Sequence, residues 1–368
     1  MPFGWENMIH HRTYLAVLLI SAVTSAVATP LAGLLAKRLG AMDLPTPRKI
    51  HRIPMPRLGG VAIFLGFCLP LGCLYLVDNS VSSYFRNFEK LTASLVFGAV
   101  LMLGLGIYDD CRGVNAIRKF LVQILIASLL YLLGFRIDAF TDPFGERDIQ
   151  LGLMGFPITI IWIVGVTNSI NLLDGIDGLV AGVTLIISAS LAVINTLTGS
   201  ALLALLNLSL VGACLGFLPS NKHPAKIFLG DSGSLTIGLI LSCIGIISLF
   251  KTGTSSVADT PIFTVPLILF GLPLFDTTRV MVLRLLAGVP IFQADKEHVH
   301  HRLLDFGLSQ KQTVWILYFI ASSFGLLSIL LARLQLGHQV QLSLLFGFVS
   351  FGSFLVWRLG LKSSIKRD

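Results

Sequence analysis

The chain has 368 residues, of which 54% are hydrophobic and only 12% are charged, and its mean hydropathy is +0.84. Because a soluble domain carries about 25% charged residues, this composition excludes an ordinary soluble protein and indicates a polytopic membrane protein. The formal net charge of +8 comes from basic residues spread over loops and tails. No soluble segment presents them together, so we do not expect nucleic-acid binding.

Repeated apolar stretches near twenty residues predict an all-α bundle of about eleven transmembrane helices. No linker or composition shift interrupts them, so residues 1–368 are expected to form a single integral membrane domain. The first stretch is expected to be a retained helix, because the basic residues follow it rather than precede it. The expected spans are roughly 14–35, 58–77, 91–108, 117–135, 154–168, 178–195, 201–218, 233–250, 261–283, 313–332 and 340–357.

The distribution of Lys and Arg over alternate loops predicts which side of the membrane each loop occupies. One set of loops carries 20 basic residues and the other carries 7. The richer side is expected to be cytoplasmic, which places the N-terminus outside and the C-terminus in the cytoplasm. Every dense polar cluster then falls in a cytoplasmic loop.

Smaller features of the spans also lead to expectations. The fifth span is short, which would fit a helix that ends early at a functional loop. Pro266 and Pro273 should kink the ninth span. Gly, Pro and alternating polarity over 136–153 are compatible with a small hairpin. Five scattered cysteines without a CxxC pair argue against both a disulfide framework and a zinc site.

The first cytoplasmic loop, DLPTPRKIHRIPMPRLGG over 43–60, is basic and rich in proline. Arginines in such a loop suit phosphate oxygens or acidic lipid headgroups, and Arg52 and Arg57 are our candidates. An ordinary positive-inside loop remains the alternative for any single arginine.

Carboxylates follow in three further cytoplasmic segments. The third span ends in IYDD, where Asp109 and Asp110 repel one another unless a cation or basic partner is present. KIFLGDSGSL places Asp231 among small residues at an expected helix start, which favours close approach of a metal–phosphate group. The alternatives are a solvated aspartate pair for IYDD and a plain helix N-cap for Asp231.

The stretch NSINLLDGIDGL over 168–179 spaces four polar side chains three residues apart. Asn168, Asn171 and Asp174 should therefore share one helix face, with Asp177 following. Oxygen ligands and amide donors of this kind suit a hard cation and a phosphate. A polar helix-end loop with capping aspartates is the alternative.

A histidine cluster, HVHHR over 298–302, lies in the loop after the ninth span. No cysteine or suitable acid completes a tetrahedral zinc set, so His298, His300, His301 and Arg302 are expected to contact a pyrophosphate or a sugar. Carboxylates, an oxygen-seeking cation and abundant Arg and His are the components of phosphoryl transfer. The residues alone thus indicate Mg²⁺-dependent chemistry on a phosphate at the cytoplasmic membrane face.

These motifs, in this order, resemble those of the polyprenyl-phosphate N-acetylhexosamine-1-phosphate transferases, over about residues 43–307. Asp109-Asp110 resembles the family's aspartate pair, NSINLLDGIDGL its central motif, and LGDSGS its magnesium site. RKIHRIPMPRLGG resembles the first cytoplasmic loop and HVHHR the HxHHR loop. The HxHHR form resembles the branch that uses UDP-N-acetylglucosamine and primes O-antigen, teichoic acid or enterobacterial common antigen. The branch that makes peptidoglycan lipid I instead carries PxHHHxE and KxGTPTMGG, which this sequence lacks.

The resemblance implies transfer of GlcNAc-1-phosphate from UDP-GlcNAc to undecaprenyl phosphate at the cytoplasmic face of the bacterial inner membrane, with release of UMP. It implies a Mg²⁺ ion, for which Mn²⁺ could substitute, held by Asp231 and Asp110. It also implies that Asp109 is the base toward the lipid phosphate and that Asp110 assists it. Asn168, Asn171, Asp174 and Asp177 are assigned to the nucleotide and the metal site. His298, His300, His301 and Arg302 are assigned to the sugar-pyrophosphate, and Arg52 and Arg57 to the lipid phosphate.

Several alternatives stay open at this point. The same chemistry could use another UDP-amino sugar or UDP-MurNAc-pentapeptide, and it could proceed by single or double displacement. Membrane lipids are expected neighbours of the basic loops, and no pattern decides whether a homodimer forms. An ion-coupled transporter is the alternative from another class, although its charged residues would lie near the bilayer midplane.

Overall fold

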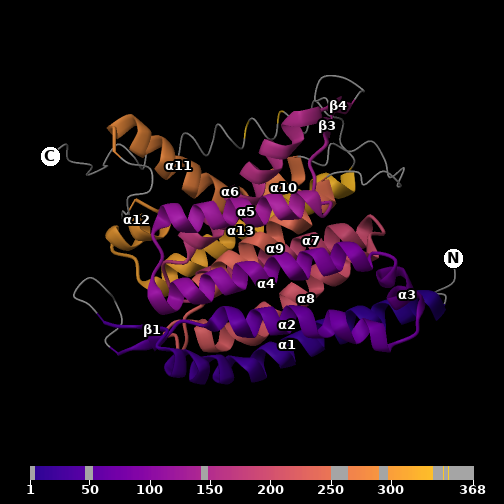
Figure 1. The fold of residues 1–368 in the computed structure, drawn as a ribbon, viewed down its shortest axis with the longest axis horizontal. Helices are drawn as coiled ribbons and strands as arrows, with labels where there is room; N and C mark the ends of the chain where they lie inside the picture. The colour runs from indigo at the N-terminus through magenta and orange to yellow at the C-terminus, as the bar shows by residue number, and fades with distance from the viewer. Residues whose placement is uncertain are drawn as a thin grey trace.

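A computed structural model describes residues 5–45, 53–141, 148–249, 264–289 and 297–334, together with residues 343 and 347. The described part is an all-α bundle with two short hairpins (Figure 1). Its longer helices are α1 (Trp5–Leu39), α2 (Gly59–Cys73), α4 (Glu89–Arg112), α5 (Ala116–Leu132), α6 (Gly155–Leu173), α7 (Leu179–Leu197), α8 (Ala201–Asn221), α9 (Gly230–Leu249), α11 (Gly271–Ala287) and α13 (Gln310–Leu334). Short elements are α3 (Ser80–Arg86), α10 (Thr264–Leu269), α12 (Val299–Asp305) and the 3₁₀ turns Leu74–Leu76 and Gly152–Met154.

Two antiparallel hairpins lie at opposite ends of the bundle. Strand β1 (Met42–Asp43) pairs with β2 (Met55–Pro56), so that Met42 faces Pro56. Strand β3 (Ala139–Thr141) pairs with β4 (Asp148–Gln150), as the hairpin prediction for 136–153 required. In Figure 1, β1 and α12 lie at the left end, whereas α3, β3 and β4 lie towards the right. Loops that the sequence assigned to opposite membrane sides are therefore at opposite ends.

Eight helices in the described part are long and apolar enough to cross a membrane. Four of the eleven expected spans differ from the prediction in length, continuity or coverage. The fourth expected span corresponds to α5, which has 17 residues, and the ninth is divided into α10 and α11 at Phe270, close to both predicted kink positions. The eleventh, 340–357, lies outside the described residues apart from 343 and 347. The fifth span was wrongly expected to be short, because α6 continues to Leu173 and carries the two asparagines of its motif.

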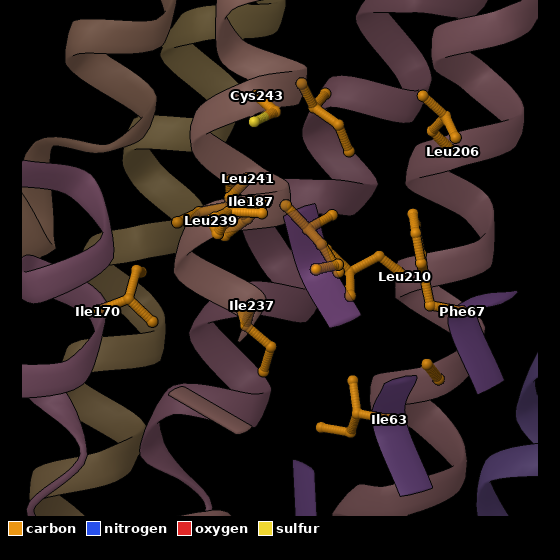
Figure 2. Packing of buried hydrophobic residues seen from close by; sticks show 14 of the residues in the cluster. Ile63, Phe67, Ile170, Ile187, Leu206, Leu210, Ile237, Leu239, Leu241 and Cys243 are labelled. Carbon is orange, nitrogen blue, oxygen red and sulfur yellow. The ribbon is translucent and has the colours of Figure 1, made fainter. Parts of the chain in front are cut away.

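The most enclosed helix is α9, which packs against α2, α4 and α6 and is flanked by α7 and α8. Its apolar residues Ile237, Leu239 and Leu241 are fully buried among aliphatic side chains of these neighbours (Figure 2). The interior also contains small residues that let helices approach closely, as is usual between membrane helices. All five cysteines are free, as predicted.

Two glycines bring the first turn of α9 against its neighbours. A Cβ atom on Gly60 of α2 would overlap the backbone of Ser232 and Gly233, and one on Gly106 of α4 would overlap the backbone of Asp231 and Ser232. Only glycine permits this separation of backbones. The start of α9 is therefore fixed between α2 and α4, and this contact positions the residues described next.

Candidate active site

Asp231 lies in the first turn of α9, as the sequence predicted. Its Oδ1 accepts a hydrogen bond from the Asn171 side-chain amide at 2.5 Å, and its Oδ2 lies 3.3 Å from the ammonium of Lys119. These contacts come from α6 and α5, so the side chain joins three helices. The plain N-cap alternative is not what the structure shows for this residue.

Asp110 caps the same helix from outside. Its Oδ1 and Oδ2 accept the backbone N–H groups of Asp231 and Ser232, each at 2.9 Å, and Arg57 Nε lies 3.5 Å away. A carboxylate at a helix N-terminus satisfies donors that have no partner inside the helix. Both oxygens of Asp110 are thus engaged by the start of α9, and Asp110, unlike Asp231, does not line the cavity described below.

Asp109 has different partners, although it is the adjacent residue. It accepts a hydrogen bond from the Val114 backbone N–H at 2.6 Å and forms an ion pair with Lys119 at 2.8 Å. Lys119 therefore bridges Asp109 and Asp231, and for Asp109 it is a basic partner of the kind that the sequence required for the adjacent aspartates. Sequence reasoning missed Lys119, because a single lysine at a helix start looks like an ordinary positive-inside residue.

The residues of NSINLLDGIDGL separate into different environments. Asn168 donates to Gln123 Oε1 at 2.5 Å on α5, away from the other polar groups. Asn171 reaches Asp231, and Asp174 is the residue that ends α6. The expected common face thus holds for Asn171 and Asp174, whereas Asn168 joins two helices.

The pKa of the Asp174 carboxyl group is raised by its surroundings. Burial, followed by the nearby Asp231 and Asp110 carboxylates, raises the pKa of Asp174 to about 8. Arg57 opposes this effect. A nearby cation would stabilise the ionised form of such a carboxyl group and lower its pKa.

The histidine segment, residues 298–302, is divided in the same way. His298 Nδ1 lies 2.8 Å from Asp276 Oδ2, and Asp276 Oδ1 accepts the Val299 backbone N–H, so His298 ties α12 to α11. Arg302 pairs with Glu297. Neither side chain lines the cavity described below, so the structure does not bring them together with the other predicted site residues.

His300 is 1% exposed, and neither of its ring nitrogens has a hydrogen-bond partner among the described residues. Burial, followed by neighbouring His301, lowers the pKa of His300 to about 3, so its ring is neutral. The ring packs directly on Gly175, where a Cβ atom would overlap it. His300 therefore supports the turn between α6 and α7 from behind, and only His301 of this segment reaches the cavity.

A cavity of about 600 Å³ opens between these elements. This size lies within the range of small-molecule sites. Six of the predicted residues line it, and His223, which the sequence analysis missed, lies between them. The predicted lining residues are Arg57, Asn171, Asp174, Asp177, Asp231 and His301. Arg52 lies outside the described residues.

The acidic residues were tested as a metal site on their geometry. Within the described ranges, no three His, Cys, Asp or Glu side chains converge on one point that could hold an ion. Mg²⁺, however, usually takes one or two carboxylates and completes its shell with water and substrate phosphates. Asp231 and Asp174, both on the cavity wall, fit that smaller requirement.

The fold and the cavity define a multi-pass membrane protein with an acidic site at one end of its bundle. Residues 92–249 match the family model described as glycosyl transferase family 4. The chain is 38% identical to a probable undecaprenyl-phosphate N-acetylglucosaminyl 1-phosphate transferase of Bacillus subtilis, over 89% of this chain and 86% of that protein.

Other relatives carry related names. A decaprenyl-phosphate N-acetylglucosaminephosphotransferase of Mycobacterium tuberculosis is 38% identical, over 83% of this chain and 80% of that protein. An undecaprenyl-phosphate alpha-N-acetylglucosaminyl 1-phosphate transferase of Escherichia coli K12 is 25% identical, over 80% and 77%. The chain belongs to the polyprenyl-phosphate N-acetylhexosamine-1-phosphate transferases, as its motifs predicted.

Proposed function

We propose that this protein transfers GlcNAc-1-phosphate from UDP-GlcNAc to a polyprenyl phosphate, undecaprenyl phosphate in a bacterial inner membrane, and releases UMP. The names of the relatives support the acceptor and the transferred group. The HVHHR form of the histidine segment supports the UDP-GlcNAc branch over the peptidoglycan branch. The product would begin a cell-envelope glycan.

The observation that carries the proposal is the pairing of acidic and basic groups on one cavity. Asp231 and Asp174 line it together with Arg57 and His301. The negative groups suit a cation and the positive ones suit the two phosphates of a nucleotide sugar. Such a site can hold a pyrophosphate and stabilise the charge that moves during phosphoryl transfer.

In the proposed reaction, an oxygen of the lipid phosphate attacks the β-phosphorus of the donor. A new P–O bond forms there, the bond to the bridging oxygen breaks, and UMP leaves with the electron pair. Asp109, which does not itself line the cavity, is assigned as the base that keeps the lipid phosphate ionised. This task is modest, since the second pKa of a phosphate monoester is about 6. Lys119, already paired with Asp109, would attract the same phosphate.

Asp231 would hold Mg²⁺, and Asp174 is the second carboxylate placed to do so. Mg²⁺, for which Mn²⁺ could substitute, would neutralise the pyrophosphate when bound. Asn171 fixes Asp231 by its hydrogen bond, so the carboxylate stays oriented towards the cavity. Asp110 acts one step further back, because it anchors the helix start that carries Asp231.

The end of the bundle that carries the cavity is proposed to face the cytoplasm, where UDP-sugars are made. The excess of Lys and Arg in the loops of that end supports this orientation. The N-terminus would then lie outside. A homodimer remains an alternative to a single subunit.

The test is UMP release by purified protein from a panel of UDP-sugars, with and without undecaprenyl phosphate and Mg²⁺. Release from UDP-GlcNAc that requires both lipid and metal is the expected result. Release only from UDP-MurNAc-pentapeptide would assign the peptidoglycan donor instead. Absence of release from every donor, with folded protein, would overturn the proposal and favour a transporter.

A further inference from the structure

His223 and Asp177 form a side-chain pair on the cavity wall that no sequence motif had indicated. His223 lies in the loop between α8 and α9, and its Nδ1 is 2.8 Å from Asp177 Oδ2. The Ala225 backbone N–H donates to the same oxygen at 3.1 Å. Both side chains line the cavity.

The two oxygens of Asp177 are used unequally. Oδ2 faces two groups, whereas Oδ1 takes part in no hydrogen bond among the described residues. A carboxylate held at one oxygen by two donors has a fixed orientation, and its second oxygen can accept one more hydrogen. Asp177 lines the cavity and its side chain is 16% exposed, so a bound ligand can reach the carboxylate.

Other contacts already hold the two loops together without His223. Asn221 accepts the Gly178 backbone N–H at 3.1 Å and donates to Ile227 O at 2.9 Å. Tyr318 donates its hydroxyl to Gly178 O at 2.6 Å. The two Asn221 bonds are buried and join the turn after α6 to the loop before α9, whereas the Tyr318 bond joins the same turn to α13. The half-buried His223 is therefore not needed to hold the backbone in place.

We propose that His223 is a positioning residue that orients Asp177, so that Asp177 Oδ1 accepts a hydrogen from the nucleotide part of the donor. That hydrogen belongs either to an N–H of the base or to an O–H of the ribose. The inference rests on the proposed function, since it presumes a uridine nucleotide in this cavity. It adds a residue whose effect is on donor binding rather than on the transfer step.

The experiment uses full-length protein in nanodiscs and UMP with Mg²⁺ as the probe, and binding is measured by calorimetry. His223→Ala should weaken UMP binding about tenfold, since a hydrogen bond to a charged group is lost. His223→Asn places an amide N–H near the position of Nδ1 and should restore binding to within about threefold of the wild type. His223→Gln carries its amide one atom further and should not restore it.

Kinetics separate positioning from a purely structural effect. His223→Ala should raise the KM for UDP-GlcNAc and leave kcat and the KM for polyprenyl phosphate unchanged. Lys222→Arg, at the exposed neighbouring position, is the matched control and should bind UMP as the wild type does. N3-methyl and deoxyribose analogues of UMP distinguish the two hydrogen sources. The analogue that lacks the relevant hydrogen should bind the wild type more weakly than UMP does. The same analogue and UMP should bind His223→Ala with equal affinity.

Two results would overturn the inference. One is UMP binding by His223→Ala that equals that of the wild type, and the other is equal weakening in the Ala and Asn variants. Failure of the wild type itself to bind any uridine nucleotide is a different outcome, because it would overturn the proposed function.

Discussion

The two sides of the cavity use their polar side chains in opposite ways. On the acidic side, formed by Asn171, Asp174 and Asp231, Asn171 and Asp231 bind each other and Asp231 lies beside Lys119. In the histidine segment, His300 is buried with no hydrogen-bond partner in the described part of the chain, and only His301 reaches the cavity. Successive helical residues point about 100° apart, so adjacent members of one motif meet different neighbours. A motif therefore identifies the site, but contacts assign each residue's role.

The largest expected effect is on the acidic side. Asp231→Asn should lower UMP release about 100- to 1,000-fold, because the site loses the carboxylate that is proposed to hold Mg²⁺ beside the transferring phosphoryl group. The variant should remain folded, which size-exclusion chromatography and thermal unfolding in detergent can verify. Asp78→Asn is the control, since Asp78 is exposed and pairs with Arg86 outside the site. Near-normal turnover at ordinary Mg²⁺ would remove Asp231 from the metal site.

The next largest effect is expected at the contact between the His300 ring and Gly175, where the two sides of the cavity meet. Gly175→Ala should lower turnover about 10- to 100-fold, because the added methyl group displaces the His300 ring and the turn that carries Asp174. The double variant with His300→Ala should recover part of the loss. Gly104→Ala, where a Cβ atom meets nothing within 4 Å, serves as the control. Unchanged kinetics in Gly175→Ala would show that this contact is unimportant.

Two histidines of one segment should give different phenotypes. His301→Ala should raise the KM for the UDP-sugar about tenfold, because His301 lines the cavity and can bind a charged phosphate.

His298→Ala should instead leave KM unchanged and lower the free energy of unfolding by about 1–3 kcal/mol, since one oxygen of the buried Asp276 loses its partner. Steady-state kinetics and thermal unfolding of both variants make the comparison. An equal rise of KM in both would return His298 to the substrate contacts.

The smallest expected effect is the change of the apparent Mg²⁺ affinity with pH. With its pKa raised to about 8, Asp174 holds a proton at neutral pH, and this proton must leave before the carboxylate binds a cation. Apparent Mg²⁺ affinity should therefore rise as pH increases, about fivefold between pH 7 and pH 8, and level off above the pKa. Phosphate groups titrate near pH 6, below this window.

The Mg²⁺ dependence of kcat/KM at several pH values measures this effect. Asp174→Asn should bind Mg²⁺ more weakly and with no such slope. A flat profile in the wild type would separate Asp174 from cation binding.

Much of the fold was predictable because the membrane imposes a strong local pattern. Apolar runs gave α2, α4, α7, α8 and α9 nearly to their ends, and prolines gave the break between α10 and α11. The length of α6 was missed, since its last turn carries polar residues that look like a loop. Asn168 and Asn171 are helical there because Gln123 and Asp231 supply partners.

The site was predictable as a collection of motifs and less so as a set of contacts. Asp231 and His301 could be selected because aspartate and histidine at such positions carry chemistry. Lys119 and His223 could not, since nothing in their own neighbourhood marks them. Lys119 pairs with Asp109 ten residues earlier but also with Asp231, 112 residues away, and His223 pairs with Asp177, 46 residues away. The two distant pairings are decided by helix packing rather than by local sequence.

The cap that Asp110 places on α9 has a consequence for biosynthesis. Its two backbone donors belong to residues 121 and 122 positions later in the chain. While the ribosome is still adding those residues, the carboxylate of Asp110 stands at the membrane boundary without them. Insertion of α9 provides both donors at once and draws α2 and α4 together around its glycine contacts. The candidate site can thus be completed only after α9 is inserted, and a nascent chain that stops before α9 should be a ready substrate for membrane quality-control proteases.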